Sequence, residues 1–183
     1  MEKAPGGTSV GVDDPYAHVD RCDFVTDDGK CRWAIERGEQ DPAFADERSR
    51  DDFQCPVVGD GDEEGLTGPW EWADCPHFQR RNRDRACLRC GLEERRLAGE
   101  GARPLLEEHH LAYPDDSSGK DELGHEITVY LCRWCHAKIH NSWAAIDDDA
   151  NPDPEAIAAR EGRLSKEREE LGFQSAAERY DEE

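Results

Sequence analysis

No part of the sequence forms a long apolar run, because only 36% of its 183 residues are hydrophobic. A helix that crosses a bilayer needs about 20 consecutive apolar residues, so the sequence predicts no membrane span. The N-terminus, MEKAPGGTSVGVDDP, also lacks the apolar core of a secretory signal. We therefore expect a cytoplasmic protein that does not contact a membrane.

Lysine is scarce as well: 5 lysines accompany 18 arginines, and 44 acidic residues bring the net charge to −21. Such a composition fits a solvated, partly disordered acidic protein. It also fits a halophilic protein, in which a carboxylate-rich, lysine-poor surface maintains solubility at high salt. We favour the halophilic interpretation, since net charge bears on solubility and partners rather than on fold.

The acidic charge is concentrated at the two ends of the chain. Residues 1–76 carry a net charge of −13 and residues 141–183 carry −8, whereas residues 77–140 hold 11 basic and 11 acidic groups. The neutral segment also holds most of the histidines and four paired cysteines. Neutrality there favours a polyanionic substrate in this segment.

So few apolar residues predict a small core, and small modules need metals or disulfides to stabilise them. In a reducing cytoplasm the eight cysteines are better suited to bind metal. We predict four regions, namely a flexible tail (1–17), a cysteine-rich zinc module (18–78), a middle domain (79–146), and an acidic linker with a helical tail (147–183).

The cysteine-rich module has wide spacings. CDFVTDDGKC (22–31) predicts a small hairpin with a cysteine at each side, and QCPVVG (54–59) and DCPHF (74–78) are near-repeats. Residues 41–53 and 69–74 form either short helices or loops. Two alternatives remain for the thiols of this module. They bind one shared zinc ion, with His18 or His77 able to replace one of the cysteine ligands, or they are separate free thiols. The four cysteines concerned are Cys22, Cys31, Cys55 and Cys75.

An arginine-rich stretch, QRRNRDR, begins the middle domain at residue 79. Arginine so dense in an acidic chain predicts a strip that contacts nucleic-acid phosphates. The alternative is an ordinary charged segment whose arginines pair with neighbouring acids. The residues concerned are Arg80, Arg81, Arg83 and Arg85.

Two CxxC pairs follow, Cys87 with Cys90 and Cys132 with Cys135. Four thiolates from such a pair of knuckles close around one tetrahedral Zn²⁺, so we predict a structural zinc. Between the knuckles, PLLEEHHLAY (104–113) and ITVYL (127–131) predict two strands, with a helix starting near Arg133. Residues 155–180 predict a charged helix, weakened at Gly162 and Gly172, that lies on the core.

Two histidine pairs lie within this insert and helix. His109 and His110 are adjacent, whereas His136 and His140 are four residues apart and therefore share one helix face. Imidazoles at the latter spacing can bind a single metal ion. A lone histidine is more often a satisfied core or surface residue. Four of them, two between the cysteine knuckles and two directly after the second knuckle, argue for a site.

EEHHLAY together with LCRWCHAKIH resembles the HNH endonuclease family in its four-cysteine subtype, over about residues 85–142. The acidic composition and the N-terminal cysteine module look similar to haloarchaeal members. The resemblance implies an α+β fold: a zinc-stabilised ββα-metal domain, treble-clef-like, with the cysteine-rich module before it and a helix after it. It further implies that His109, His136 and His140 bind a catalytic divalent ion (Mg, Mn, Zn or Ni), and that His110 is the general base.

The sequence departs from the family at one position. The usual asparagine before the second strand is missing, because no asparagine lies between Asn82 and Asn141. Glu126 is the residue available to orient the general base instead.

The resemblance implies hydrolysis of DNA, with RNA as an alternative substrate. Histidine suits the base role, since its ordinary pKa lies near neutrality. The alternative function is a non-catalytic zinc module that binds nucleic acid or protein, or a purely structural double-zinc interaction protein. The sequence gives no indication of the oligomeric state.

Overall fold

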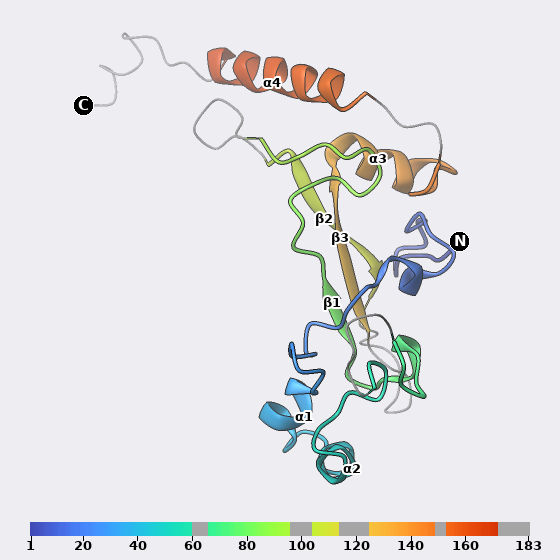
Figure 1. Cartoon of the computed structure of the whole chain (residues 1–183). Coiled ribbons are helices and arrows are strands. Elements are labelled where there is room, and N and C mark those ends of the chain that lie inside the picture. Colours follow the sequence, from blue (N-terminus) through green and yellow to red (C-terminus); the bar gives the residue numbers. More distant parts are fainter. Residues whose placement is uncertain (60–65, 96–103, 114–124, 149–152, 172–183) are drawn as a thin grey trace, which may run out of the picture. The chain divides into compact units, whose positions relative to one another are not determined.

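The computed structural model describes residues 1–59, 66–95, 104–113, 125–148 and 153–171. Within these ranges the protein is a mixed α+β fold with a three-stranded sheet in the order β1-β3-β2 (Figure 1). The strands are β1 (Gln79–Arg81), β2 (Leu106–Ala112) and β3 (Glu126–Cys132). The helices are α1 (Arg32–Arg37), α2 (Pro42–Arg50), α3 (Arg133–Asn141) and α4 (Pro154–Leu171), with 3-10 turns η1 (Pro15–His18) and η2 (Trp72–Asp74). The predicted α+β class is confirmed.

The fold divides into two compact units, and neither is one continuous segment. Unit 1 consists of Met1–Asn82 and His110–Thr128, and unit 2 consists of Arg83–His109 and Val129–Glu183. Strands β2 and β3 therefore contribute residues to both units. These boundaries differ from the predicted 18–78 and 79–146, because the two strands of the middle domain are shared between the units.

Residues 1–17, expected as a flexible tail, are part of the packing of unit 1. Val10 and Val12 are buried, and Lys3 and Ser9 form an antiparallel bridge. The 3-10 turn η1 begins where the Asp14 carboxylate accepts the backbone N–H of Tyr16 at 2.9 Å. The apolar side chains of this segment are too few to be recognised by periodicity, yet they are covered by tertiary contacts.

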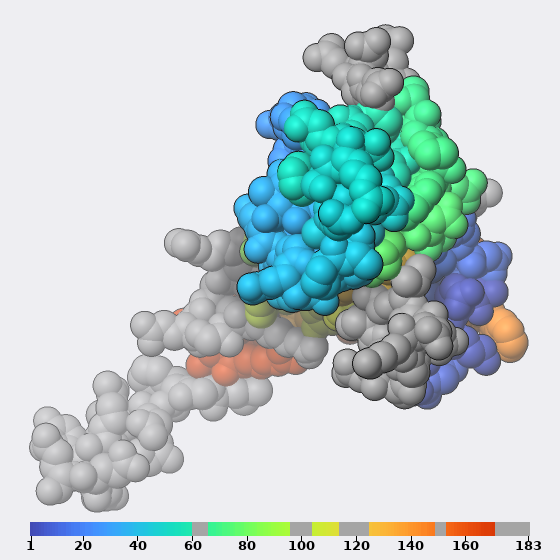
Figure 2. Space-filling view, turned by 90° about the horizontal axis from the view of Figure 1, so that it is seen from below, coloured from blue at the N-terminus to red at the C-terminus, as the bar shows by residue number. Residues whose placement is uncertain are grey.

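Helices α1 and α2 form one small layer of unit 1 (blue to teal in Figure 2). The second begins at Pro42, after Asp41, whose carboxylate accepts the N–H of Phe44 at 3.1 Å. An N-terminal aspartate cap followed by proline is a strong helix start. Trp33 and Phe44 pack edge to face with ring centroids 5.9 Å apart. The stretch 41–53 is thus a helix for most of its length, and the predicted hairpin at 22–31 has one antiparallel bridge, Val25 to Cys31.

Strand β1 was not predicted. It pairs in parallel with β3, with Gln79 opposite Glu126 and Arg81 opposite Thr128. Its three residues, QRR, have no apolar alternation, so the pattern that identifies a half-buried strand is absent. The extended conformation of β1 depends on its pairing with β3.

The core of unit 2 lies under α3 and α4. Leu105, Leu131 and Ile139 are fully buried, and α4 contributes Ile157, which is 7% exposed. A helix is present where the sequence predicted one, and α4 continues through Gly162, the position predicted to weaken it. Gly172 lies outside the described residues. Among the described residues, no helix combines the length and apolar content needed to cross a bilayer.

One ion pair joins α4 to the start of α3: Arg133 with Glu161, whose side chains are 14% and 9% exposed. Removing one partner of a buried pair costs about 3–5 kcal/mol. This pair is only partly desolvated, so we expect Glu161→Gln to lower the free energy of unfolding by about 2 kcal/mol. Chemical denaturation checks this value. Glu167→Gln, in the same helix outside the pair, is the control and should leave stability unchanged.

Candidate metal centres

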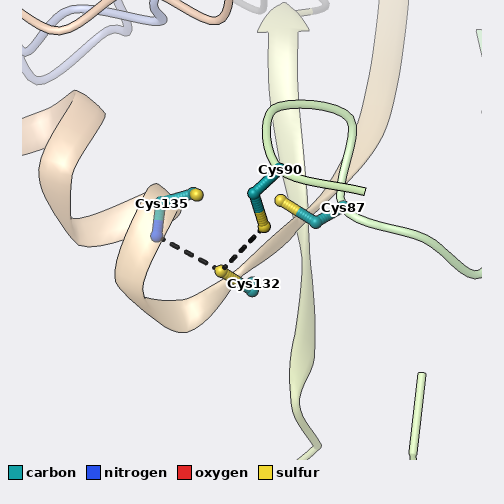
Figure 3. A group of neighbouring side chains, drawn as sticks. All are labelled: Cys87, Cys90, Cys132 and Cys135. Carbon is teal, nitrogen blue, oxygen red and sulfur yellow. Dashed lines mark hydrogen bonds between the residues drawn. The ribbon is translucent and has the colours of Figure 1, made fainter. Parts of the chain in front are cut away.

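The four cysteines of the two CxxC pairs meet in unit 2. Cys87 and Cys90 lie in a tight turn that ends at Gly91, whose φ of 73° favours glycine. Cys132 caps α3 and Cys135 lies in its first turn. Figure 3 shows the four side chains facing one another from these two elements. All four sulfur atoms lie within 4.8 Å of one another.

The spacing of these sulfurs fits a tetrahedral ion. Cys90 Sγ and Cys132 Sγ are 3.9 Å apart, and a tetrahedron with Zn–S bonds of about 2.3 Å has edges of about 3.8 Å. The backbone N–H of Cys135 donates to Cys132 Sγ at 3.5 Å. Cys87, Cys132 and Cys135 are at most 2% exposed. The cluster could therefore bind a metal ion, as the paired spacing predicted.

The thiols of this cluster favour one negative sulfur, that of Cys87. Hydrogen bonds from the Cys132 and Cys135 thiols hold the pKa of Cys87 well below its ordinary value. The hydrogen bond with Cys132, followed by that with Cys87, raises the pKa of Cys135. Arg89, 5% exposed, places one guanidinium nitrogen 3.9 Å from Cys135 Sγ and donates to the carbonyl of Ala145 at 3.0 Å. A buried cation beside four thiols offsets the charge they would carry as metal ligands.

A second cluster in unit 2 consists of three histidines. His109 comes from β2, and His136 and His140 come from successive turns of α3. One nitrogen of each ring lies within 4.8 Å of the other two. The ring centroids are 4.8 to 5.1 Å apart. The structure thus brings together the three residues that the HNH resemblance implied, and these could bind one metal ion.

A carboxylate orients one of the three rings. The Glu107 carboxylate lies 2.7 Å from His136 Nδ1, and His136 Nε2 lies 3.1 Å from His140 Nε2. A carboxylate on one ring nitrogen fixes the tautomer and leaves the other nitrogen available as a ligand. Sequence reasoning missed Glu107. Strand alternation in EEHH was the available signal, because Glu107 and His109 are two residues apart and share a face.

His110 and Glu126 approach each other in unit 1. His110 Nε2 is 3.5 Å from Glu126 Oε1, and the His110 ring stacks on Tyr113 at 4.8 Å. Arg81 donates two hydrogen bonds to Glu126, at 2.8 and 3.0 Å, and Gln79 donates one at 2.5 Å. Burial raises the pKa of Glu126, but these hydrogen bonds and the Arg81 charge lower it below its ordinary value. Glu126 is therefore an ionised acceptor.

The four arginines of the predicted phosphate strip have different partners. Arg80 pairs with Asp20 at 2.7 Å, and Arg81 pairs with Glu126. Arg85 lies over the Tyr130 ring at 5.2 Å and donates to its hydroxyl at 3.1 Å. Arg83 is exposed. Arg80 and Arg81 thus pair with acids, as the alternative interpretation expects, and contact with phosphates stays a prediction.

The N-terminal cysteines Cys22, Cys31, Cys55 and Cys75 are all buried in unit 1. No three of their sulfur atoms lie within 4.8 Å of one another. The two histidines considered as substitutes differ in position. His77 stacks on Trp33 at 3.4 Å and contacts the Asp41 carboxylate at 3.0 Å, whereas His18 ends η1.

Comparison with known proteins yields one family. A model described as a family of unknown function (DUF7097) matches residues 1–179. The chain belongs to this family. No curated protein and no solved structure matches the chain. The DUF7097 match includes residues of both units, and so includes every cysteine and histidine discussed above.

Proposed function

We propose that this DUF7097 protein is a metal-dependent endonuclease of the HNH type that hydrolyses phosphodiester bonds in DNA, with RNA as the alternative substrate. The main support is that His109, His136 and His140 lie close together, and that the Glu107 carboxylate contacts His136 Nδ1. Three neutral imidazoles with a carboxylate partner are the ligands of a divalent transition metal. The four-cysteine cluster is proposed as the structural zinc of the same domain.

The donor set fits Zn²⁺, Ni²⁺ or Mn²⁺ better than it fits Mg²⁺, because imidazole is a softer ligand than carboxylate or water. Such an ion, when bound, would offset the negative charge that develops on phosphate and leaving oxygen. His109 is 2% exposed, so its ring is held by packing. His136 and His140 are half-buried and keep one side open. A metal ion held by one buried and two half-buried histidines would be fixed in position and still accessible to a substrate phosphate.

His110 is the proposed general base. An Nε2–H directed at the ionised Glu126 carboxylate leaves Nδ1 as the basic nitrogen, which takes the proton from water. Arg81 and Gln79 hold Glu126 in place through their hydrogen bonds. Glu126 thereby supplies the orientation that the absent asparagine gives in the family. Its role is positioning rather than chemical.

Trp143 supports a nucleic-acid substrate. It follows α3 directly and is 95% exposed. The ring of an exposed tryptophan is in contact with water unless a ligand covers it. Stacking of a nucleic-acid base on such a ring contributes about 1–3 kcal/mol to binding. Because stacking is short-ranged, it persists at molar salt, where the Debye length is about 3 Å. The −21 charge of the chain would weaken long-range attraction to DNA at low salt.

A second candidate function is a non-catalytic metal-binding module that binds nucleic acid or protein on the same scaffold. The net charge of −21 favours it, since an excess of acidic groups repels DNA at low salt. Ile127, the next residue, is 1% exposed and offers no polar group.

A plasmid-nicking assay at high salt with Mn²⁺, Mg²⁺ or Ni²⁺ tests the nuclease. We expect cleavage by the native chain and a loss of about 10²–10⁴-fold in His110→Ala, the range typical for a general base. Zinc content and the circular-dichroism spectrum should be unchanged. His18→Ala, a histidine outside both candidate centres, should cleave normally.

Equal trace cleavage by the native chain and by His110→Ala would identify a contaminant and refute the nuclease. Metal-dependent DNA binding without cleavage would support the non-catalytic module instead.

A further inference from the structure

Unit 1 contains a pocket of about 690 Å³ beside the end of α2. This volume lies within the range of about 300–1,000 Å³ that is typical of small-molecule sites. The proposed nuclease uses none of the residues that line the pocket. Its lining includes charged and polar side chains and one indole ring, from Glu47, Arg48, Asp51, Gln54, Thr67 and Trp70.

Two backbone segments that lie against each other form one side of this pocket. The N–H of Gly68 donates to the carbonyl of Val57 at 3.0 Å, and the N–H of Trp70 donates to the carbonyl of Pro56 at 3.2 Å. A Cβ atom on Gly68 would collide with the Pro56 carbonyl oxygen, so this close approach requires glycine. The backbone that carries Trp70 is therefore held in place.

Arg48 supplies a buried cation to the pocket. The residue is 5% exposed, and its guanidinium lies 5.3 Å from the Trp70 ring centroid and 5.8 Å from that of Phe44. Nη2 donates to the carboxylate of Glu47, which is exposed. In the part of the chain that the structure describes, the buried Nε has no hydrogen-bond partner. Because an unpaired buried donor is unfavourable, a ligand oxygen that reaches this guanidinium would be bound strongly.

Asp51 supplies a carboxylate to the same pocket. It is the C-cap residue of α2, and its N–H donates to the carbonyl of Arg48 at 3.1 Å, whereas its side chain is exposed. The lining thus combines one cation with two carboxylates, those of Glu47 and Asp51. These carboxylates would repel a nucleic-acid phosphate or another simple anion, and Arg48 would repel a simple cation. A ligand that carries both charges is complementary to both kinds of side chain.

The Trp70 ring adds an apolar surface. Trp70 is half-buried, so part of its indole is uncovered, and Pro56 and Pro69 also line the pocket. Aromatic rings pack favourably against an indole in offset or edge-to-face arrangements. The third requirement on the ligand is therefore an apolar or aromatic group.

We propose that this pocket binds a small zwitterion with an apolar or aromatic side chain, and that an aromatic α-amino acid is its simplest ligand. The ligand carboxylate accepts hydrogen bonds from Arg48, its ammonium group lies at Asp51, and its ring packs against Trp70. All of these residues belong to unit 1. The site goes beyond the proposed nuclease and does not depend on its activity.

Binding of three related probes to the full chain tests the proposal. Phenylalanine carries both charges, N-acetylphenylalanine carries only the carboxylate, and phenylalaninamide carries only the ammonium group at slightly acidic pH, where α-amino groups are protonated. Isothermal titration calorimetry should give a Kd for phenylalanine that is about tenfold lower than that of either singly charged probe.

Two substitutions separate the charges. In Arg48→Gln, phenylalanine and phenylalaninamide should bind equally, because the partner of the carboxylate is gone. In Asp51→Asn, phenylalanine and N-acetylphenylalanine should bind equally. Asp51 is exposed, so this second variant keeps the fold even if Arg48→Gln does not. Arg50→Gln is the matched control, since the Arg50 side chain lies in the same helix, is 70% exposed and pairs with Asp46. It should bind phenylalanine as the native chain does.

An equal or higher affinity of the native chain for either singly charged probe would overturn the proposal. So would the absence of phenylalanine binding at millimolar concentration, or a preference for phenylalanine over N-acetylphenylalanine that persists in Asp51→Asn. None of these measurements involves metal or DNA, so failure here is distinct from failure of the nuclease.

Discussion

Replacing Cys132 with serine should remove the metal from the four-cysteine cluster and unfold unit 2. Cys132 is 0% exposed, and it serves both as a candidate ligand and as the cap of α3. Binding of a structural zinc to a small domain contributes about 10–16 kcal/mol at pH 7. Because whole domains are stable by only about 5–15 kcal/mol, the loss of one ligand is sufficient to unfold this one.

Zinc content, thermal unfolding by circular dichroism and amide NMR dispersion check this result. Leu88→Ser is the control, because Leu88 lies in the other cysteine pair of the cluster, between Cys87 and Cys90, and is 39% exposed. It should keep the zinc and the native midpoint. If Cys132→Ser keeps both, the cluster has no structural metal.

Two substitutions should weaken the binding of a divalent ion to the three-histidine cluster to different extents. His136→Ala removes one of three ligands, so binding of Mn²⁺ or Co²⁺ should become undetectable at micromolar concentration. Glu107→Gln leaves all three rings in place but removes the carboxylate 2.7 Å from His136 Nδ1. Substitution of such a partner lowers metal affinity by about 10–100-fold.

Manganese binding measured by electron paramagnetic resonance, or heat measured on titration, gives both affinities. Glu167→Gln is the control, since it makes the same change at an exposed residue of unit 2 that lies outside every candidate metal group. It should bind the ion normally. Equal affinities of Glu107→Gln and Glu167→Gln would show that the carboxylate has no role in the site.

The insert between the cysteine knuckles was the part of the fold most accessible from the sequence. ITVYL and the apolar positions around EEHH gave the two strands, and α3 begins at Arg133 as expected. Spacing alone placed His136 and His140 on one helix face, and strand order brought His109 to them. Local periodicity sufficed here because each of these elements has one buried face.

The first part of the chain was less accessible. Val10 and Val12 are buried in a segment expected to be a tail, and β1 has no apolar pattern of its own. Arg80 and Arg81, which lie in β1, pair with carboxylates from distant positions. Arg81 and Glu126 are 45 residues apart in the sequence, so no local pattern predicts that they pair.

The sequence by itself determined which residue types can bind metal in this protein: two CxxC pairs and histidines at strand and helix spacing. These depend on covalent spacing and on the period of one element. Only the tertiary structure decided which acid orients His136, which cation lies beside the four-cysteine cluster of unit 2, and which residues hold Glu126. Those choices arise from contacts between distant segments, where the free energy of burying a charge selects its partner.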